Sequence, residues 1–346
     1  MPSNGHIKSD LSLQDRELIS LLQWAPRITW GEAAEILDAH ATTLAGRWEK
    51  LERSGIAWIT AQVNLSDTRN QLSFIEISCD PGDWAHVVDT FTAMPEVISV
   101  EAFAPSPDLG LTVLSHDLDS LSRFVEEQIS RVPGVAKVQL MLSSRLHRAG
   151  DKWRLDRLTD EQRAAAQAWT AAEQAALPTS TTALGEDQRP VIEALMRDGR
   201  ASAAEIARST GLHPATARRY LQKVLASGLL SIRCDLVQGL SSSLVTAQWF
   251  MRLNASRHED AAEALAKDPR TRVVSSITGR SNMMVVMWLS SVGEIIEAEQ
   301  AIQSLVSDVE IQESVISLRP LKRMGWVLEN ERNTTRTFVA PHLQLS

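Results

Sequence analysis

Apolar residues recur at helical spacing near the start of the chain. Leu18, Leu21 and Leu22 share one face of a helix. Two more helical segments follow, "TWGEAAEIL" and "HATTLAGRWEKLERSG". Three short helices in this order are typical of a helix-turn-helix unit. We predict a first, winged-helix-like domain of this kind over residues 10–60.

After residue 70 the hydrophobic pattern alternates between the period of strands and that of helices. The segments, in order, are "LSFIEISC", "WAHVVDTFTAM", "VISVEAF", "LGLTVLS", "SLSRFVEEQIS" and "VAKVQLML". Their order of strand, helix, strand, strand, helix, strand is that of a ferredoxin-like unit. We predict such a domain over residues 70–146.

The same series recurs in the second half of the chain. A shift of 173 positions places Arg27 on Arg200, and the shift becomes 174 further on, where Val135 meets Val309. Two copies indicate a duplication rather than a solenoid. We therefore predict an α+β fold with two helix-turn-helix units and two ferredoxin-like βαββαβ units in tandem. The second pair is expected over residues 184–234 and 243–320.

Two further segments complete the domain plan. Residues 151–183 are expected to form a connecting helix and linker, with Thr159 and Gln162 as a capping box at the helix start. Residues 321–346 are expected to form a polar C-terminal tail that is poorly ordered toward its end.

Composition narrows the class of protein. The net charge of −8 argues against a uniformly basic surface, so nucleic-acid binding has to depend on local patches. Cys79 and Cys234 lack the spacing of a zinc site or a disulfide framework, and we predict no metal and no cofactor. The chain has no apolar run of membrane-spanning length and no signal peptide, so we expect a cytoplasmic protein without a membrane partner.

The third helix of the second copy, in "GLHPATARRYLQKVLASGLL", is the main candidate for DNA binding. Helical spacing turns Ala217, Leu221, Val224 and Leu225 inward. It leaves a polar face for the major groove, made of Ala215, Thr216, Arg218, Arg219, Gln222 and Lys223. Thr216 can bond a phosphate or a base edge, and either arginine can contact guanine O6 and N7. Lys223 and Arg200 are expected to hold phosphate.

The first copy is less basic than the second. Residues 13–59 hold five basic and seven acidic residues, a net charge of −2, whereas residues 186–233 hold eight basic and five acidic, a net of +3. Ala45 and Gly46 stand where the second copy has its arginine pair. The candidate DNA contacts of the first copy are therefore Thr42, Thr43 and Arg47. We predict that double-stranded DNA binds the second copy more strongly.

A helix-turn-helix followed by a ferredoxin-like unit resembles the Lrp/AsnC family of transcription regulators. The likeness is carried by "DGRASAAEIARSTG", "GLHPATARRYLQKVLASGLL" and "ITGRSNMMVVMW". The resemblance implies DNA binding by the helix-turn-helix unit, and pairing of ferredoxin-like units that sense a small molecule, often an amino acid. It also implies self-association, and we expect a homodimer or homotetramer.

The glycine-containing loop of the second copy is the candidate effector site. Gly279 permits close backbone approach, and Arg280, Ser281 and Asn282 offer donors to a carboxylate or amide. Asp108 is the corresponding candidate in the first copy, where Pro105 replaces the glycine. A plain β-hairpin turn explains the same residues equally well.

Two other functions remain open. Proteins with this domain pair include decarboxylases of a haem precursor of the siroheme type, with a histidine- and arginine-rich signature before the ferredoxin-like unit. The matching segments, "TRNQLSFIEI" and "GLSSSLVTAQ", contain no histidine, and we therefore expect a regulator rather than an enzyme. A helix-turn-helix used only for protein contacts is the third alternative.

Overall fold

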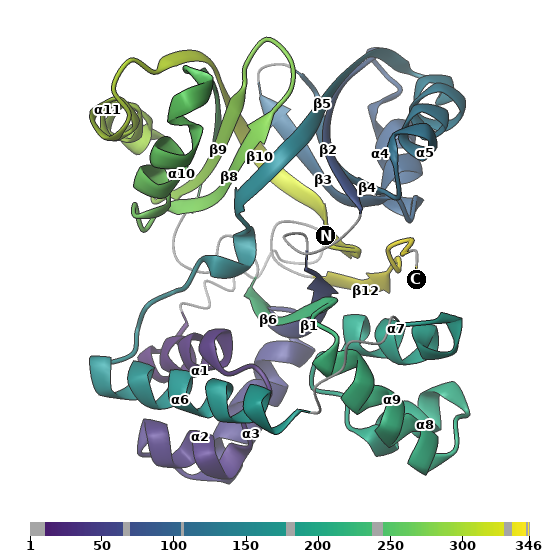
Figure 1. Ribbon diagram of the computed structural model, residues 1–346, viewed down its shortest axis with the longest axis vertical. Helices are drawn as coiled ribbons and strands as arrows, with labels where there is room; N and C mark the ends of the chain where they lie inside the picture. The colour runs from purple at the N-terminus through teal and green to yellow at the C-terminus, as the bar shows by residue number, and fades with distance from the viewer. Residues whose placement is uncertain are drawn as a thin grey trace, which may run out of the picture.

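The computed structural model describes residues 11–64, 70–104, 107–177, 184–236, 245–328, 334–343 and 345 (Figure 1). The predicted linker at 178–183 and Pro105 of the first-copy loop lie outside these residues. In the part of the chain that is described, no helix combines the length and the apolar character needed to cross a bilayer.

Each half begins with three helices and a strand. The elements of the first head are α1 (Leu13–Trp24), α2 (Trp30–Leu37), α3 (Ala41–Arg53) and β1 (Ala57–Val63). Those of the second head are α7 (Arg189–Arg197), α8 (Ala203–Thr210), α9 (Pro214–Ala226) and β6 (Leu230–Leu236). The second helix of each head starts with a capping box, Thr29 with Glu32 and Ser202 with Glu205. Each box satisfies free N–H groups in the first turn of its helix, so α2 and α8 each begin at a defined residue.

The two heads share one ribbon. β1 and β6 pair antiparallel along their whole length, from Ala57 opposite Leu236 to Val63 opposite Leu230. The strand that follows the third helix of each head therefore pairs with its counterpart from the other head. This ribbon lies between the heads and the sheet above them (Figure 1).

The upper part of the molecule consists of two ferredoxin-like units. The first contains β2 (Gln71–Cys79), α4 (Trp84–Ala93), β3 (Val97–Ala104), β4 (Leu109–Ser115), α5 (Leu118–Arg123) and β5 (Val135–Arg148). The second contains β7 (Val245–Arg252), α10 (His258–Ala266), β8 (Thr271–Ile277), β9 (Met283–Leu289), α11 (Ile295–Leu305) and β10 (Glu310–Arg323). The predicted α+β class and ferredoxin-like order are confirmed.

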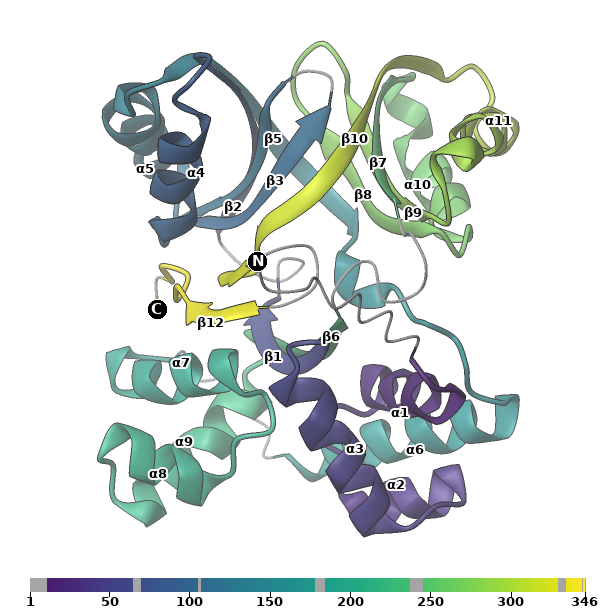
Figure 2. The ribbon, with the colours of Figure 1, turned by 180° about the vertical axis from the view of Figure 1, so that it is seen from behind.

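The long strands β5 and β10 join the units into a closed barrel. β5 pairs with β2 of its own unit and with β8 of the other, and β10 pairs with β7 of its own unit and with β3 of the other. Eight strands thus close on themselves, with the helices of both units on the outer flanks (Figure 2). Inside the barrel, large apolar side chains pack together, among them Phe103, Met141, Phe250 and Met284.

The segments that follow each ferredoxin-like unit pack against other parts of the chain. α6 (Asp160–Ala176) starts with the predicted Thr159–Gln162 capping box and packs on the first head, where Thr170 Oγ1 donates to the Trp24 carbonyl at 3.0 Å. β11 (Trp326–Leu328) and β12 (Thr334–Phe338) extend the sheet from β10. The prediction of a poorly ordered tail end is wrong for Leu343 and Leu345, because both are buried against the core of the second head.

Candidate DNA-binding helix and ligand cavity

The polar face of α9 is exposed as the helical spacing predicts. Ala217, Leu221 and Val224 are buried, and Leu225 is half-buried against the same core. Four predicted contact residues are exposed and two, Thr216 and Lys223, are half-exposed; the exposed ones are Ala215, Arg218, Arg219 and Gln222. Pro214 occupies the first helical position and His213 Nδ1 accepts from the Ala215 N–H at 3.3 Å, so the helix start is capped. A rigid helix therefore presents two arginines and small residues to one side.

The corresponding face of α3 is different. Thr42 and Thr43 are exposed. Arg47 folds back on the start of α1, where Nη1 lies 3.1 Å from Asp15 Oδ1 and 3.4 Å from Ser12 Oγ. An arginine held in this way would have to break an ion pair before it could contact DNA.

Arg200 lies at a contact between the two heads, which the sequence did not predict. Its guanidinium donates to the carbonyls of Pro26 at 2.8 Å and Ile28 at 2.7 Å, both in the first head. It also stacks over the Trp30 ring, 4.3 Å from the ring centre. Burial in this contact lowers the pKa of Arg200. The expectation that Arg200 holds phosphate is therefore corrected: its donors already serve a contact between the heads.

The glycine loop joins β8 to β9, and its polar groups are largely used within the protein. Gly279 has φ +125°, a conformation that side chains disfavour. Ser281 Oγ donates to Gln312 Oε1 at 2.8 Å. Asn282 bonds both the N–H and the carbonyl of Leu253, at 3.1 and 2.8 Å. These contacts fix the turn.

The two remaining effector candidates lie apart from each other. The carbonyl of Arg280 accepts from Arg252 at 2.7 Å, while Arg280 itself is exposed. In the first copy, Asp108 Oδ2 accepts from the Cys79 N–H at 2.7 Å. None of the five candidates lines the cavity that is enclosed by strands of both ferredoxin-like units.

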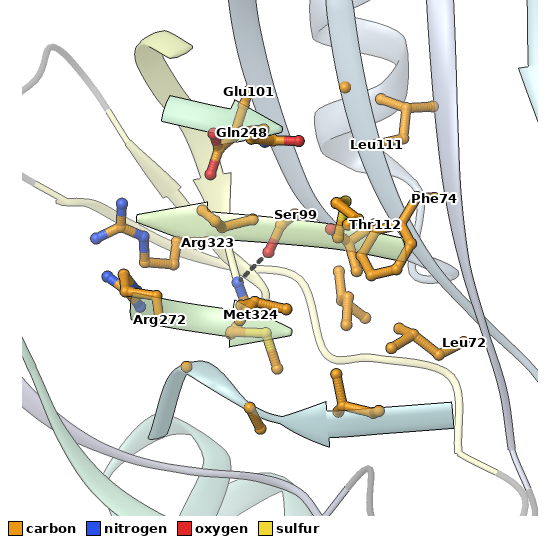
Figure 3. Close-up of a pocket in the computed structure, with 18 of the residues that line it drawn as sticks. Leu72, Phe74, Ser99, Glu101, Leu111, Thr112, Gln248, Arg272, Arg323 and Met324 are labelled. Carbon is orange, nitrogen blue, oxygen red and sulfur yellow. Dashed lines mark hydrogen bonds between the residues drawn. The ribbon is translucent and has the colours of Figure 1, made fainter. Parts of the chain in front are cut away.

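That cavity lies in the barrel and extends to the β1–β6 ribbon (Figure 3). Its volume is about 340 Å³, within the usual range for small-molecule sites. Strands of both ferredoxin-like units and both strands of the ribbon line it. The apolar part of the wall includes Leu72, Phe74, Phe103, Phe250 and Met284.

Four cationic side chains face this cavity, Lys152, Arg233, Arg272 and Arg323. Arg272 stacks on Trp288 with its guanidinium carbon 3.6 Å from the ring centre, and Arg323 lies 5.7 Å from the same ring. In Figure 3 these two arginines lie at one end and Leu72 and Phe74 at the other. The cavity thus has a basic end and an apolar end.

Burial makes these charges costly. It is the largest cause that lowers the pKa of Arg272 well below its usual value, and the neighbouring Arg323 and Arg233 lower it further. Arg233 forms an ion pair with the buried Asp235, and Arg323 donates to the Leu236 carbonyl at 3.3 Å. A bound anion would offset the repulsion between the arginines.

Two carboxyl groups also line the cavity. Burial raises the pKa of Glu76 to about 7, with a contribution from Glu313. Glu76 Oε1 and Glu101 Oε2 are buried, and neither has a hydrogen-bond partner among the described residues. Polar atoms left in this state are costly, and a ligand or water in the cavity could bond them.

Sequence reasoning missed the cavity residues because they share no local motif. Arg233, Arg272 and Arg323 stand on three separate strands and meet only through the barrel and ribbon pairings. The available signal was an arginine inside an otherwise apolar strand, as in "SIRCDL" and "TRVVSSI". Charged residues are rarely buried without a partner or a function.

Comparisons with known families identify two parts of the chain. Residues 72–149 match the Lrp/AsnC ligand binding domain, and residues 190–231 match the IclR helix-turn-helix domain. An uncharacterized HTH-type transcriptional regulator of Pyrococcus abyssi is 25% identical over 145 residues, which cover 41% of this chain and 92% of that protein. Another from Pyrococcus horikoshii is 23% identical over 145 residues, with the same coverage of 41% and 92%.

The solved structures include one that is similar over nearly the whole chain. The siroheme decarboxylase NirDL superposes with a TM-score of 0.57 and 15% identity, over 91% of this chain and 94% of that one. Its co-complex with an iron-uroporphyrin III analogue gives a TM-score of 0.58 at 15% identity, over 90% and 93%. At this identity the likeness shows the fold alone. Residues 72–149 thus carry an Lrp/AsnC-type ligand-binding domain and residues 190–231 a helix-turn-helix domain, the combination found in an Lrp/AsnC-like regulator.

Proposed function

We propose that this chain is a DNA-binding transcription regulator in which two regulator units were joined by duplication. The observation that carries the proposal is the polar face of α9, which is exposed and basic on a capped helix. Such a helix can enter the major groove, where Arg218 and Arg219 reach guanine and Thr216 reaches a base edge or phosphate. Lys223 adds a phosphate contact.

We propose that the first head binds DNA more weakly than the second. Thr42 and Thr43 can bond phosphate or bases, but Arg47 is paired with Asp15. Phosphate attraction also favours the more basic second head. The two heads would therefore read unequal half-sites, from a protein that works in the cytoplasm as a homodimer or homotetramer of this chain.

The effector is proposed to bind in the cavity, with the glycine loop and its exposed Arg280 as the lesser candidate. A ligand with one or more carboxylates would bond Arg233, Arg272 and Arg323, while its apolar part would contact the phenyl rings at the other side. Amino acids and larger organic acids both belong to this class. Arg233 stands on the ribbon that joins the heads, whereas Arg272 stands on the barrel. An anion between them would link ligand binding to the position of the heads.

A decarboxylase of the siroheme type is the second candidate, because the fold is similar to NirDL and the cavity has a basic end. An iron tetrapyrrole would then be the substrate, its carboxylates held by the arginines. Loss of CO₂ leaves a carbon that needs a proton, and Glu76, with a pKa of about 7, is the available acid. The cavity wall, as far as it is described, includes no histidine or tyrosine, which favours the regulator.

The two candidates can be separated with the purified full chain. For a regulator, capture of sheared genomic DNA enriches discrete fragments, and the Arg218→Ala, Arg219→Ala variant loses them. For the enzyme, incubation with siroheme releases CO₂, and Glu76→Gln slows the release. Absence of fragment enrichment together with CO₂ release would replace the first proposal by the second.

A further inference from the structure

We propose that Arg27 and Arg200 form a reciprocal clasp that fixes the distance between the two recognition helices, so that the chain accepts only one half-site spacing. The link to half-sites rests on the proposed DNA binding, whereas the clasp itself concerns the protein alone. Both arginines follow the first helix of their head and occupy equivalent positions in the repeat.

Each arginine bonds the residues on either side of the other. Arg200 donates to the carbonyls of Pro26 and Ile28, the neighbours of Arg27. Arg27 donates to the carbonyls of Gly199 and, at 3.4 Å, Ala201, the neighbours of Arg200. The exchange is the pattern of a twofold-symmetric interface, formed here within one chain.

The contact is half-buried, with part of each guanidinium shielded from solvent. Burial lowers the pKa of both arginines, and the charge of Arg27 lowers that of Arg200 further, while acidic groups near each guanidinium act in the opposite direction. Glu173 of α6 lies 3.9 Å from Arg27 Nε, and Asp198 Oδ1 accepts from the backbone N–H of Arg200 at 2.8 Å. Hydrogen bonds from a charged donor are shorter and stronger than neutral ones, and reduced contact with water strengthens them further.

Backbone contacts next to the clasp leave little free space. The Gly199 N–H donates to the Ile59 carbonyl at 2.8 Å, and Thr60 Oγ1 donates to the Met196 carbonyl at 2.5 Å. A Cβ at Gly199 would lie 2.8 Å from a methyl of Ile59 and 2.9 Å from one of Ile232. The turn after α7 therefore packs directly against the ribbon, and only glycine at position 199 permits this close contact.

The two arms of the clasp are unequal. Trp30 stacks on Arg200, whereas the equivalent residue beside Arg27 is Ala203. Both carbonyl contacts of Arg200 are 2.8 Å or shorter, whereas the second contact of Arg27, to the Ala201 carbonyl, is 3.4 Å long. Loss of Arg200 should therefore loosen the heads more than loss of Arg27.

A fixed clasp has a consequence for DNA. Each arginine lies in the loop just before the second helix of a helix-turn-helix, so the clasp holds both motifs at once. Two recognition helices on a rigid frame meet half-sites at one separation along the duplex. A chain without the clasp should bind DNA more weakly and should accept half-sites at other separations.

The first test measures the distance between α3 and α9 without DNA. Spin labels are placed at Glu49→Cys and Gln222→Cys, which are exposed and equivalent in the repeat. Cys79 is changed to Ser, and the buried Cys234 remains. Pulsed electron resonance should give one narrow distance for the parent chain and a distribution at least twice as broad for Arg27→Ala with Arg200→Ala.

Controls separate the clasp from general damage. Arg208→Ala removes an exposed arginine of the second head and should leave the distribution unchanged. Arg200→Lys keeps the charge but loses the planar guanidinium that reaches both carbonyls and stacks on Trp30. It should give an intermediate width and serves if the double variant does not fold. Equal widths in the parent and in a folded clasp variant would overturn the proposal.

The second test uses DNA fragments captured by the parent chain, with one to three base pairs inserted between the protected segments. The parent should lose at least tenfold in affinity, and the clasp variant less than threefold. A clasp variant as sensitive to insertion as the parent would contradict the spacing claim. If the parent captures no DNA, the proposed function fails while the distance measurement still decides the clasp.

Discussion

The two halves of the chain share one order of helices and strands but differ in their arginines. On the recognition helix, the second half has Arg218 and Arg219 where the first has Ala45 and Gly46. The difference extends into the cavity, where Arg233, Arg272 and Arg323 correspond to Thr60, Ile98 and Ala149. The second half therefore supplies the arginines of both proposed sites, whereas the first supplies Leu72, Phe74 and the two carboxyl groups of the cavity wall.

This contrast shows that a duplicated fold can be kept while its surface changes. Both heads retain their capping boxes, a third helix with one buried apolar face, and their pairing in the ribbon. Buried positions also differ, as Leu18 and Val191 do, but they stay apolar, whereas the arginine pair of α9 faces solvent and Arg272 faces the cavity. Variants at equivalent positions of the two halves therefore test the account directly.

The largest difference is expected on the recognition helices. Arg218→Ala with Arg219→Ala should reduce DNA affinity by about 2–6 kcal/mol, since a bidentate arginine–guanine contact contributes roughly 1–3 kcal/mol. Arg47→Ala should cost less than about 1 kcal/mol, because Arg47 is paired with Asp15. Binding titrations at a fixed salt concentration check this, and equal losses would remove the distinction between the heads.

The next difference concerns Glu76, whose equivalent in the second unit is Phe250. Its pKa is raised to about 7 in the folded protein, so between pH 4.5 and 7 the folded state binds more protons than the unfolded state. Stability from this group is therefore present at low pH and falls as the pH rises, by up to about 3 kcal/mol. Glu76→Gln should flatten that part of the stability profile, as measured by urea unfolding from pH 4.5 to 8. An unchanged slope would show that Glu76 titrates normally.

A third difference separates the cavity from the glycine loop. An anionic ligand at about one hundred times its Kd should stabilise the chain by about 2.7 kcal/mol. A thermal-shift screen of amino acids and larger organic acids should find such a ligand, and Arg272→Ala should abolish its shift while Arg280→Ala preserves it. Loss of the shift in Arg280→Ala alone would return the effector site to the loop.

The smallest effect should be equal in the two halves. Thr29→Ala and Ser202→Ala each remove a capping box from the second helix of a head. Each should cost about 1 kcal/mol of stability. Unequal costs, measured by chemical unfolding, would mean that the heads differ in their folded framework as well as in their surfaces.

The sequence predicted the parts of this molecule that depend on local patterns. Helical spacing correctly placed Ala217, Leu221 and Val224 inside, and the strand and helix order indicated the ferredoxin-like unit. Arg200 was misassigned because its carbonyl acceptors lie in the other head, more than 170 residues away. The barrel cavity also depends on contacts between strands of different units, which no local period encodes. The burial of Leu343 and Leu345 was missed for the same reason.

The central claim is that the chain reads DNA mainly through α9. Its most direct test is a genome-wide occupancy map in cells that carry either the parent chain or the Arg218→Ala, Arg219→Ala variant at equal abundance. We predict discrete occupied sites for the parent, loss of most of them in the variant and their retention in Arg47→Ala. An occupancy map with no discrete sites for the parent chain would contradict the claim.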